Sequence, residues 1–280
     1  MTKMKFRLLA LDLDGTLLTD DKKISPRAIS ALRAAADAGV TVVFCTGRRY
    51  RTVIPMVQQV GRPIPVAYNN GAAVRNCPQH DIVFKNLFPT QHFLPVIDLL
   101  ESFGLKPVLH VDRFEDGIDL CCARSDTNHF HRAYVSRNAE FLVELDDLRE
   151  SPADKIIQFI VMERLARLTP AYEALGKFAT TDELNVHIVR NLTIGASALE
   201  VLSPLGEKWQ AVWHIAKSRG IGRDEIVAIG DDISDCGLLR NAGLGIAVEN
   251  ALQEVKDSAD LLVPRNNDDG AAIAIERFFL

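Results

Sequence analysis

Short apolar segments that end in polar residues alternate along this chain with segments of helical pattern. The first apolar segment, 6–13, ends in acidic residues and a glycine, and Ser25-Pro26 then has the residues of a helix start, a serine N-cap before a proline. Gly39 marks the end of that helix, and a second apolar segment follows at 40–45. Such alternation predicts an α/β fold with a doubly wound parallel sheet, in which ligands bind beyond the carboxyl ends of the strands.

The alternation is interrupted once and then resumes. Strands of the same sheet are expected at 66–68, 225–229, 246–248 and 261–263, and helices at 207–219 and 234–241. Between them, residues 84–190 carry strand pairs beside helices, a pattern typical of an inserted α+β domain. The expected helices of this insert are 90–103 and 170–178, and its expected strands are 107–111, 118–123, 155–161 and 186–189. We therefore expect a discontinuous core domain formed by 1–83 and 191–280, and an inserted domain formed by 84–190.

Composition limits the classes of partner. A formal net charge of −5 over 280 residues argues against a nucleic-acid-binding surface. No segment approaches the ~20 consecutive apolar residues of a membrane span, so no membrane partner is expected. The five cysteines form no CxxC pair, which favours reduced thiols and a cytoplasmic protein over a zinc ribbon or a disulfide framework. The sequence leaves monomer and homodimer both open.

Two acidic clusters follow strands of the predicted sheet. Asp12 and Asp14 end the first strand, where alternation places both on one side, and Asp231, Asp232 and Asp235 follow a later strand. Carboxylates this close repel one another unless a cation or a proton lies between them. Each cluster taken alone could instead cap the next helix or turn. Because the ends of parallel strands meet at one rim, the two clusters together predict a site for a hard cation such as Mg²⁺.

Two further features indicate a phosphate site at the same rim. Thr46-Gly47-Arg48 follows the second strand, and a hydroxyl with backbone N–H groups at a helix N-terminus attracts anions. Thr46 could equally serve only as a helix cap. Lys208 lies in the first turn of a helix, where its charge opposes the helix dipole, and this misfit indicates another role, although surface lysines are common.

The residues above, in this order, resemble the four motifs of the haloacid dehalogenase superfamily of phosphohydrolases. The similarity is to its Cof-like sugar-phosphate phosphatase branch, which has a large α/β cap of type C2B. The matching motifs are Asp12-Leu13-Asp14-Gly15-Thr16, Thr46-Gly47-Arg48, Lys208, and Gly230-Asp231 with Asp235. Three further segments of this chain resemble secondary signatures of the branch: Asn70-Gly71-Ala72, Asn250-Ala251 and Asn267-Asp268-Asp269-Gly270. The resemblance covers both core segments, whereas the insert agrees only in length and position.

The resemblance implies a Rossmann-like core with an inserted cap, and a Mg²⁺-dependent phosphatase of small phosphate monoesters, such as sugar phosphates or similar metabolites. Asp12 would attack phosphorus and form an aspartyl-phosphate, while Asp14 would protonate the leaving alcohol and then deprotonate the attacking water. Mg²⁺ would bind Asp12, the backbone carbonyl of Asp14, and Asp231. The residues implied to contact phosphate or substrate are Thr46, Gly47, Arg48, Lys208 and Asn70. Asp235 and Asp232 would lie in the surroundings of the metal waters or of Lys208.

The chain departs from the family pattern at two places, and two other functions are compatible with the same core. Many relatives carry Asn-Asp where this chain has Ser234-Asp235, which weakens any role for Ser234, and the segment before Lys208 is about one residue shorter than the common form. A phosphomutase and a catalytically silent protein that binds a phosphorylated ligand could share this core. The intact acidic motifs argue against the silent protein. The substrate, and the cap residues that contact its leaving group, are not identified by the sequence.

Overall fold

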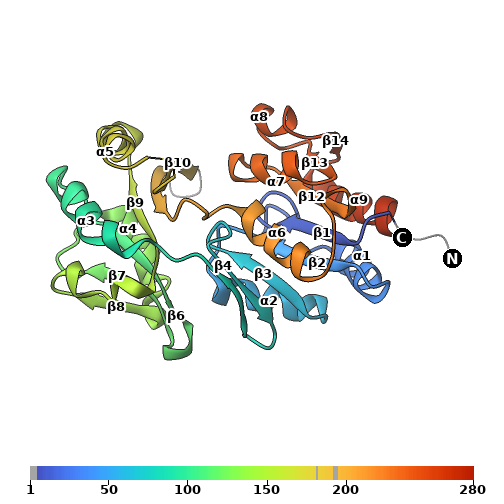
Figure 1. The fold of residues 1–280 in the computed structure, drawn as a ribbon, viewed down its shortest axis with the longest axis horizontal. Helices are drawn as coiled ribbons and strands as arrows, with labels where there is room; N and C mark the ends of the chain where they lie inside the picture. Colours follow the sequence, from blue (N-terminus) through green and yellow to red (C-terminus); the bar gives the residue numbers. More distant parts are fainter. Residues whose placement is uncertain (1–4, 181, 192–194) are drawn as a thin grey trace. The chain divides into compact units, whose positions relative to one another are not determined.

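The computed structural model describes residues 5–180, 182–191 and 195–280, and divides the chain into two compact units. The core unit comprises Met1–Lys85 and Glu207–Leu280, and the inserted unit comprises Asn86–Gly206 (Figure 1). The α/β fold and the inserted α+β unit agree with the sequence prediction. The second boundary lies later than the expected 190/191, because the strand Ala196–Leu202 pairs within the inserted unit.

An eight-stranded sheet forms the centre of the core unit. Its order is β14-β13-β12-β1-β2-β3-β4-β5, and the first six strands of this order are mutually parallel. The strands are β1 (Leu8–Asp12), β2 (Thr41–Cys45), β3 (Ile64–Tyr68), β4 (Ala73–Cys77), β5 (Ile82–Lys85), β12 (Ile226–Gly230), β13 (Leu244–Val248) and β14 (Leu261–Val263). Every residue of β1 and β12 is buried, as expected for near-continuous apolar strands at the centre of a parallel sheet.

Helices cover both faces of this sheet. They are α1 (Pro26–Asp37), α2 (Tyr50–Val60), α6 (Lys208–Ser218), α7 (Cys236–Asn241), α8 (Gln253–Lys256) and α9 (Gly270–Phe279). Helix α1 contacts α2 and α9, whereas α6 contacts α7, β2 and β3. Connections between parallel strands are right-handed as a rule, so α1 and α2, which lead toward β3, are expected on the opposite face from α7 and α8, which lead toward β14. The contacts of α9 with α1 and of α6 with α7 assign the other two helices to these faces.

The hairpin of β4 and β5 extends the sheet beyond the strands expected from the sequence. Strand β3 turns directly into β4 through Asn69, Asn70 and Gly71, which all have positive φ. Asparagine and glycine tolerate this left-handed backbone better than other residues. The turn therefore reverses the chain at the rim of the sheet where β3 ends.

The inserted unit is a second, separate sheet with helices. Its strand order is β10-β11-β9-β6-β7-β8, antiparallel except for the pair β7–β8. The strands are β6 (Val108–Arg113), β7 (Ile118–Ala123), β8 (Leu142–Leu145), β9 (Ile156–Glu163), β10 (Asn185–Asn191) and β11 (Ala196–Leu202). The helices are α3 (Phe93–Ser102), α4 (His129–Ser136) and α5 (Leu165–Phe178). Side chains of α3 and α5 pack with one face of the sheet in a large apolar cluster, and α4 packs with smaller clusters.

Helix α5 begins five residues before the expected start at Pro170. The buried Leu168 lies on the same apolar stripe as Ala171 and Leu175, and burial of this stripe extends the helix through the proline. In the described part of the chain, no helix combines the length and the apolar character needed to cross a membrane.

Helix α1 begins as its sequence predicts, and its cap can be tested. Ser25 Oγ accepts a hydrogen bond from Ala28 N at 3.1 Å and donates one to Asp269 Oδ1 at 2.5 Å. Ser25→Ala should lower the free energy of unfolding by about 1 kcal/mol in equilibrium urea denaturation. Ser30→Ala, which removes an exposed bond to Pro26 O in the same helix, should change it by less than about 0.5 kcal/mol. Equal losses in the two variants would contradict the capping role.

Candidate active site

The ends of three neighbouring strands bring the candidate residues together. Asp12 is the last residue of β1, Asp231 directly follows β12, and Thr46 directly follows β2. Strand β1 pairs in parallel with both of the others, so all three strands end at the same rim. The order of the strands in the sheet therefore places residues from positions 12, 46 and 231 of the chain around one point.

The Lys208 ammonium lies between two carboxylates at this rim. Its Nζ donates hydrogen bonds to Asp12 Oδ1 at 2.7 Å and to Asp235 Oδ1 at 2.8 Å. Only 3% of the Lys208 side chain is exposed, and Asp235 is fully buried. Burial alone would lower the pKa of Lys208, but the charges of Asp12 and Asp235 raise it well above its usual value. Lys208 is therefore a fixed positive charge beside the Asp12 carboxylate.

Gly71 allows the first turn of α6 to approach the rim. A Cβ atom on Gly71 would lie 2.5 Å from the Glu207 carbonyl oxygen and 2.8 Å from Lys208 Cα, and the φ of Gly71 is +85°. Any larger residue would push Lys208 away or strain the turn. This contact explains why the Asn70-Gly71 turn and the start of α6 lie together.

The carboxylates of Asp12, Asp231 and Asp235 form a group suited to a divalent cation. Ligand oxygens of the three lie within 4.8 Å of one another. Together with Lys208 they carry an excess of two negative charges when ionised, and Mg²⁺ prefers carboxylate oxygens. Burial raises the pKa of Asp12 well above its usual value. The attraction of Lys208 opposes this rise, whereas the charges of Asp235 and Asp231 add to it. The residues therefore fit a Mg²⁺ site.

Asp231 is held in place by the loop that follows β1. Thr16 Oγ1 donates a hydrogen bond to Asp231 Oδ1 at 2.6 Å, and a Cβ on Gly15 would lie 2.3 Å from Asp231 Oδ2. Burial raises the pKa of Asp231 to about 6, although the bond from Thr16 opposes the rise. The sequence prediction included Thr16 only as part of a motif, since nothing in the spacing indicates which carboxylate its hydroxyl contacts.

Asp235 and Asp232 differ in their surroundings. Besides Lys208, Asp235 accepts hydrogen bonds at Oδ2 from the backbone N–H groups of Asp231 and Asp232, at 3.2 and 3.1 Å. Both of its oxygens are thus engaged, so Asp235 is better placed to orient Lys208 and the loop than to bind a metal directly. The Asp232 side chain accepts a long bond, 3.5 Å, from Ser234 Oγ and does not contact Lys208 in the described residues.

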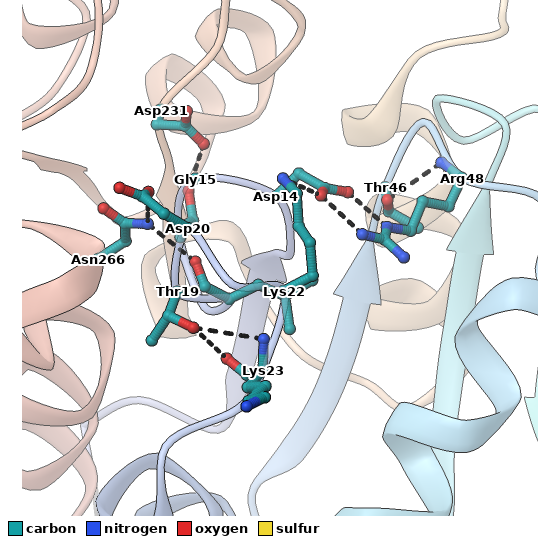
Figure 2. A network of polar contacts seen from close by, with 12 residues as sticks. Asp14, Gly15, Thr19, Asp20, Lys22, Lys23, Thr46, Arg48, Asp231 and Asn266 are labelled. Carbon is teal, nitrogen blue, oxygen red and sulfur yellow. Dashed lines mark hydrogen bonds and ion pairs between the residues drawn. The ribbon is translucent and has the colours of Figure 1, made fainter. Parts of the chain in front are cut away.

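Asp14 points away from the metal group, toward two cations (Figure 2). Arg48 donates from Nε to Asp14 Oδ2 at 2.5 Å and from a terminal nitrogen to Oδ1 at 2.7 Å, and Lys22 Nζ donates to Oδ1 at 2.9 Å. Burial alone would raise the pKa of Asp14, but the bonds from Arg48 and Lys22 lower it to about 2. With 39% of its side chain exposed, Asp14 is accessible to a ligand.

The other candidate phosphate residues lie beside these groups. Thr46 is buried, and its Oγ1 accepts a hydrogen bond from Arg48 N at 3.1 Å. The Arg48 side chain itself contacts Asp14, which its place in the sequence motif did not predict. Asn70 is bonded through its backbone N to Thr46 O at 2.9 Å, and a Cβ on Gly47 would meet Asn70 Oδ1 at 3.0 Å. Thr46, Gly47 and Asn70 are thus packed together next to the rim.

Two asparagines fix the loop after β1 from the C-terminal part of the chain. Asn250 Nδ2 donates to Gly15 O at 2.7 Å, and Asn250 Oδ1 accepts from Asn266 N at 3.0 Å. The buried Asn266 in turn donates to Leu18 O at 2.9 Å. Asn250 stood within a secondary signature of the sequence, whereas Asn266 carried no signal, because its contacts form only when distant segments meet.

A family model described as haloacid dehalogenase-like hydrolase matches residues 9–275 of this chain. The chain is 27% identical to the 5-amino-6-(5-phospho-D-ribitylamino)uracil phosphatase YitU of Bacillus subtilis (strain 168), covering 97% of each protein. It is 26% identical to the pyridoxal phosphate phosphatase YbhA of Escherichia coli (strain K12), over 96% of this chain and 97% of that one.

A solved structure shows the same fold. The structure of a haloacid dehalogenase-like hydrolase from Bacteroides thetaiotaomicron superimposes with a TM-score of 0.82 at 23% identity, covering 98% of this chain and 100% of that chain. The family match and this superposition both extend through the core unit and the inserted unit.

The close contact of Gly71 with α6 predicts an unusually costly substitution. Gly39 is a matched control, because its φ is +89° but a Cβ there would meet nothing within 4 Å. Gly39→Ala should cost about 1–2 kcal/mol for the left-handed backbone alone. Gly71→Ala should cost a further 1–3 kcal/mol or so, because the added methyl group overlaps Glu207. Urea denaturation followed by the fluorescence of Trp209 and Trp213, both on α6, measures both costs, and equal costs would contradict the contact.

Proposed function

Because this chain belongs to the haloacid dehalogenase-like hydrolases and is a phosphatase of small phosphorylated metabolites, we propose that it works through an aspartyl-phosphate on Asp12 and depends on Mg²⁺. The observation that carries this proposal is the buried contact of Lys208 with Asp12 and Asp235. A lysine fixed beside a carboxylate at a strand end suits a reaction in which negative charge is brought to that carboxylate.

The free oxygen of Asp12 is the proposed nucleophile. Among the described residues, Asp12 Oδ1 accepts the bond from Lys208, and Oδ2 accepts no hydrogen bond. Attack by Oδ2 on phosphorus would break the bond to the ester oxygen and leave the phosphoryl group on Asp12. Lys208, with the hydroxyl of Thr46, would hold phosphoryl oxygens as their charge redistributes. Water would then release inorganic phosphate and restore the carboxylate.

The proposed metal ligands are the carboxylates of Asp12 and Asp231 and the backbone carbonyl of Asp14. When bound, Mg²⁺ supplies positive charge that allows an anionic nucleophile and an anionic ester to approach each other. Thr16 and Gly15 support this set by fixing the Asp231 carboxylate. Asp235 would orient Lys208, and Asp232, at the edge of the loop, is given no part in the chemistry.

Asp14 is the proposed acid and base. It would give a proton to the leaving oxygen and later take one from the attacking water. Its exposure and its position two residues from Asp12 support this role. Arg48 and Lys22 favour its ionised form, which is the form required for the second step. The first step requires the protonated form, so Asp14 must take up a proton from solvent as the substrate binds.

Sugar phosphates or similar metabolites are the proposed substrate class. The names of YitU and YbhA specify a phosphorylated ribityl compound and pyridoxal phosphate, which are small phosphate monoesters. A phosphomutase would use the same phospho-aspartate but return the phosphoryl group to a sugar. A silent binding protein would need no nucleophile, and the intact group around Asp12 weighs against it.

A cytoplasmic location is proposed as well, for a monomer or a homodimer that binds a small phosphorylated substrate and neither nucleic acid nor membrane. All five cysteines are buried and free, which fits a reducing compartment. The net charge of −5 supports the absence of a nucleic-acid partner.

The metal and the nucleophile can be tested together. Wild-type protein should release inorganic phosphate from a panel of sugar phosphates, nucleotides and flavin mononucleotide with Mg²⁺, and should lose this activity with a chelator. Asp12→Asn should lower the rate at least ~10³-fold, because the amide is a poor nucleophile. Transfer of phosphate between sugar positions without release would indicate a phosphomutase. Wild-type-like turnover by Asp12→Asn would remove Asp12 from its role.

The role of Asp14 predicts a dependence on the leaving group. Asp14→Asn should slow hydrolysis of sugar phosphates by about 10²–10⁴-fold, because an alkoxide needs a proton to leave. With p-nitrophenyl phosphate, whose leaving group needs none, the variant should give a rapid burst of about one nitrophenolate per enzyme and then turn over slowly, since the attacking water lacks its base. Stopped-flow absorbance measures the burst, and its absence together with an equal loss on both esters would contradict the assignment.

A further inference from the structure

The turn after β1 brings a second lysine to the candidate site. Thr19 and Lys23 close this turn, with Thr19 N donating to Lys23 O at 3.0 Å and Lys23 N donating to Thr19 Oγ1 at 3.3 Å. Lys22 lies at its tip with a φ of +60°, a left-handed conformation that is uncommon for lysine (Figure 2). The Lys22 side chain thereby extends back to Asp14.

The turn is attached to the core at its base. Asn266 Nδ2 donates to Asp20 Oδ1 at 3.0 Å, and Asn267 Nδ2 donates to Asp20 Oδ2 at 2.8 Å. With the bond from Asn266 to Leu18 O described above, these contacts hold the start of the turn and the side chain of Asp20. The backbone at Lys22 is therefore held at a fixed place relative to the core, so that the position of its ammonium does not depend on the flexible side chain alone.

Lys22 has hydrogen-bonding capacity that the protein does not use. An ammonium group has three N–H donors, and within the described residues Lys22 Nζ donates only to Asp14 Oδ1, at 2.9 Å. Its side chain is 52% exposed, so the remaining donors face solvent. Arg48 already binds the same carboxylate through two nitrogens. Two cations thus share one carboxylate, and one positive charge is in excess at this contact.

We propose that Lys22 is a specificity-determining residue, which contacts the leaving group and favours substrates that carry a carboxylate or a second phosphate close to the ester oxygen. This inference rests on the proposed function, in which Asp14 hydrogen-bonds that oxygen. Nζ would then lie within roughly 7 Å of the ester oxygen, given ordinary hydrogen-bond lengths. An anionic substituent one or two carbon atoms away from the oxygen reaches this distance, and a neutral hydroxyl group there gains much less.

Two phosphate esters that differ in one group provide the test. Phosphoglycolate carries a carboxylate where 2-hydroxyethyl phosphate carries a hydroxymethyl group. Each is measured as a competitive inhibitor of p-nitrophenyl phosphate hydrolysis, which gives an inhibition constant even for an ester that turns over slowly, and kcat/KM is measured where it does turn over. Lys22→Met should raise the inhibition constant of phosphoglycolate about 5-fold, the upper range for a half-exposed charge pair, and that of 2-hydroxyethyl phosphate less than 2-fold.

Two further variants complete the experiment. Lys22→Arg, which keeps the charge, should retain most of the preference for phosphoglycolate. Lys23→Met is the matched control, because Lys23 is the next residue in the same exposed turn and its ammonium contacts no described residue. It should leave both inhibition constants unchanged. A raised preference for phosphoglycolate at low ionic strength in the wild type, absent in Lys22→Met, would give independent support.

The outcomes separate this inference from the proposed function. Equal effects of Lys22→Met on both esters would mean that Lys22 only positions Asp14, and no effect on either would mean that it does not contact the leaving group. Either result overturns the inference and leaves the phosphatase mechanism intact. Failure of the wild type to hydrolyse p-nitrophenyl phosphate or any other ester would overturn the proposed function, and the inference with it.

Discussion

The buried ammonium of Lys208 is the interaction on which the rest of the site depends. A lone charge in the protein interior costs several kcal/mol, so a lysine with 3% of its side chain exposed requires carboxylates around it. Asp12 and Asp235 meet this need, but they come from β1 and from the turn after β12. Burial of the lysine is therefore favourable only when α6 packs against both of those segments. The same packing places the Lys208 ammonium beside the proposed nucleophile, Asp12.

Close backbone packing makes that meeting possible. Gly71 admits the first turn of α6, and Gly15 admits the Asp231 carboxylate, at distances that a side chain at either position would not allow. Hydrogen bonds then fix the loop that follows β1: Thr16 bonds to Asp231, and Asn250 and Asn266 bond to backbone carbonyls of the loop. These bonds, and that of Lys208 to Asp12, join the polar rim to residues from distant parts of the chain.

Much of this arrangement could be predicted from the sequence, because it depends on local patterns. Apolar segments ending in Asp12 or before Asp231 identify central strands, and parallel topology then brings their ends together. The pairing of β11 within the inserted unit was not predicted, because antiparallel partners are chosen by register and burial across the sheet. The Lys22 contact with Asp14 was missed for a similar reason, since it depends on a turn conformation that composition does not specify.

The insertion of Asn86–Gly206 between two halves of the core has an energetic consequence. Closing a flexible loop costs only about 0.6 kcal/mol more for each doubling of its length, so a core held by its own contacts tolerates a long insert. The contacts between Asp12, Lys208 and Asp231 join segments on both sides of the insert, and all of them lie within the core unit. The inserted sheet, with its separate apolar cluster, can therefore change in sequence without disturbing the bonds that position these charged groups.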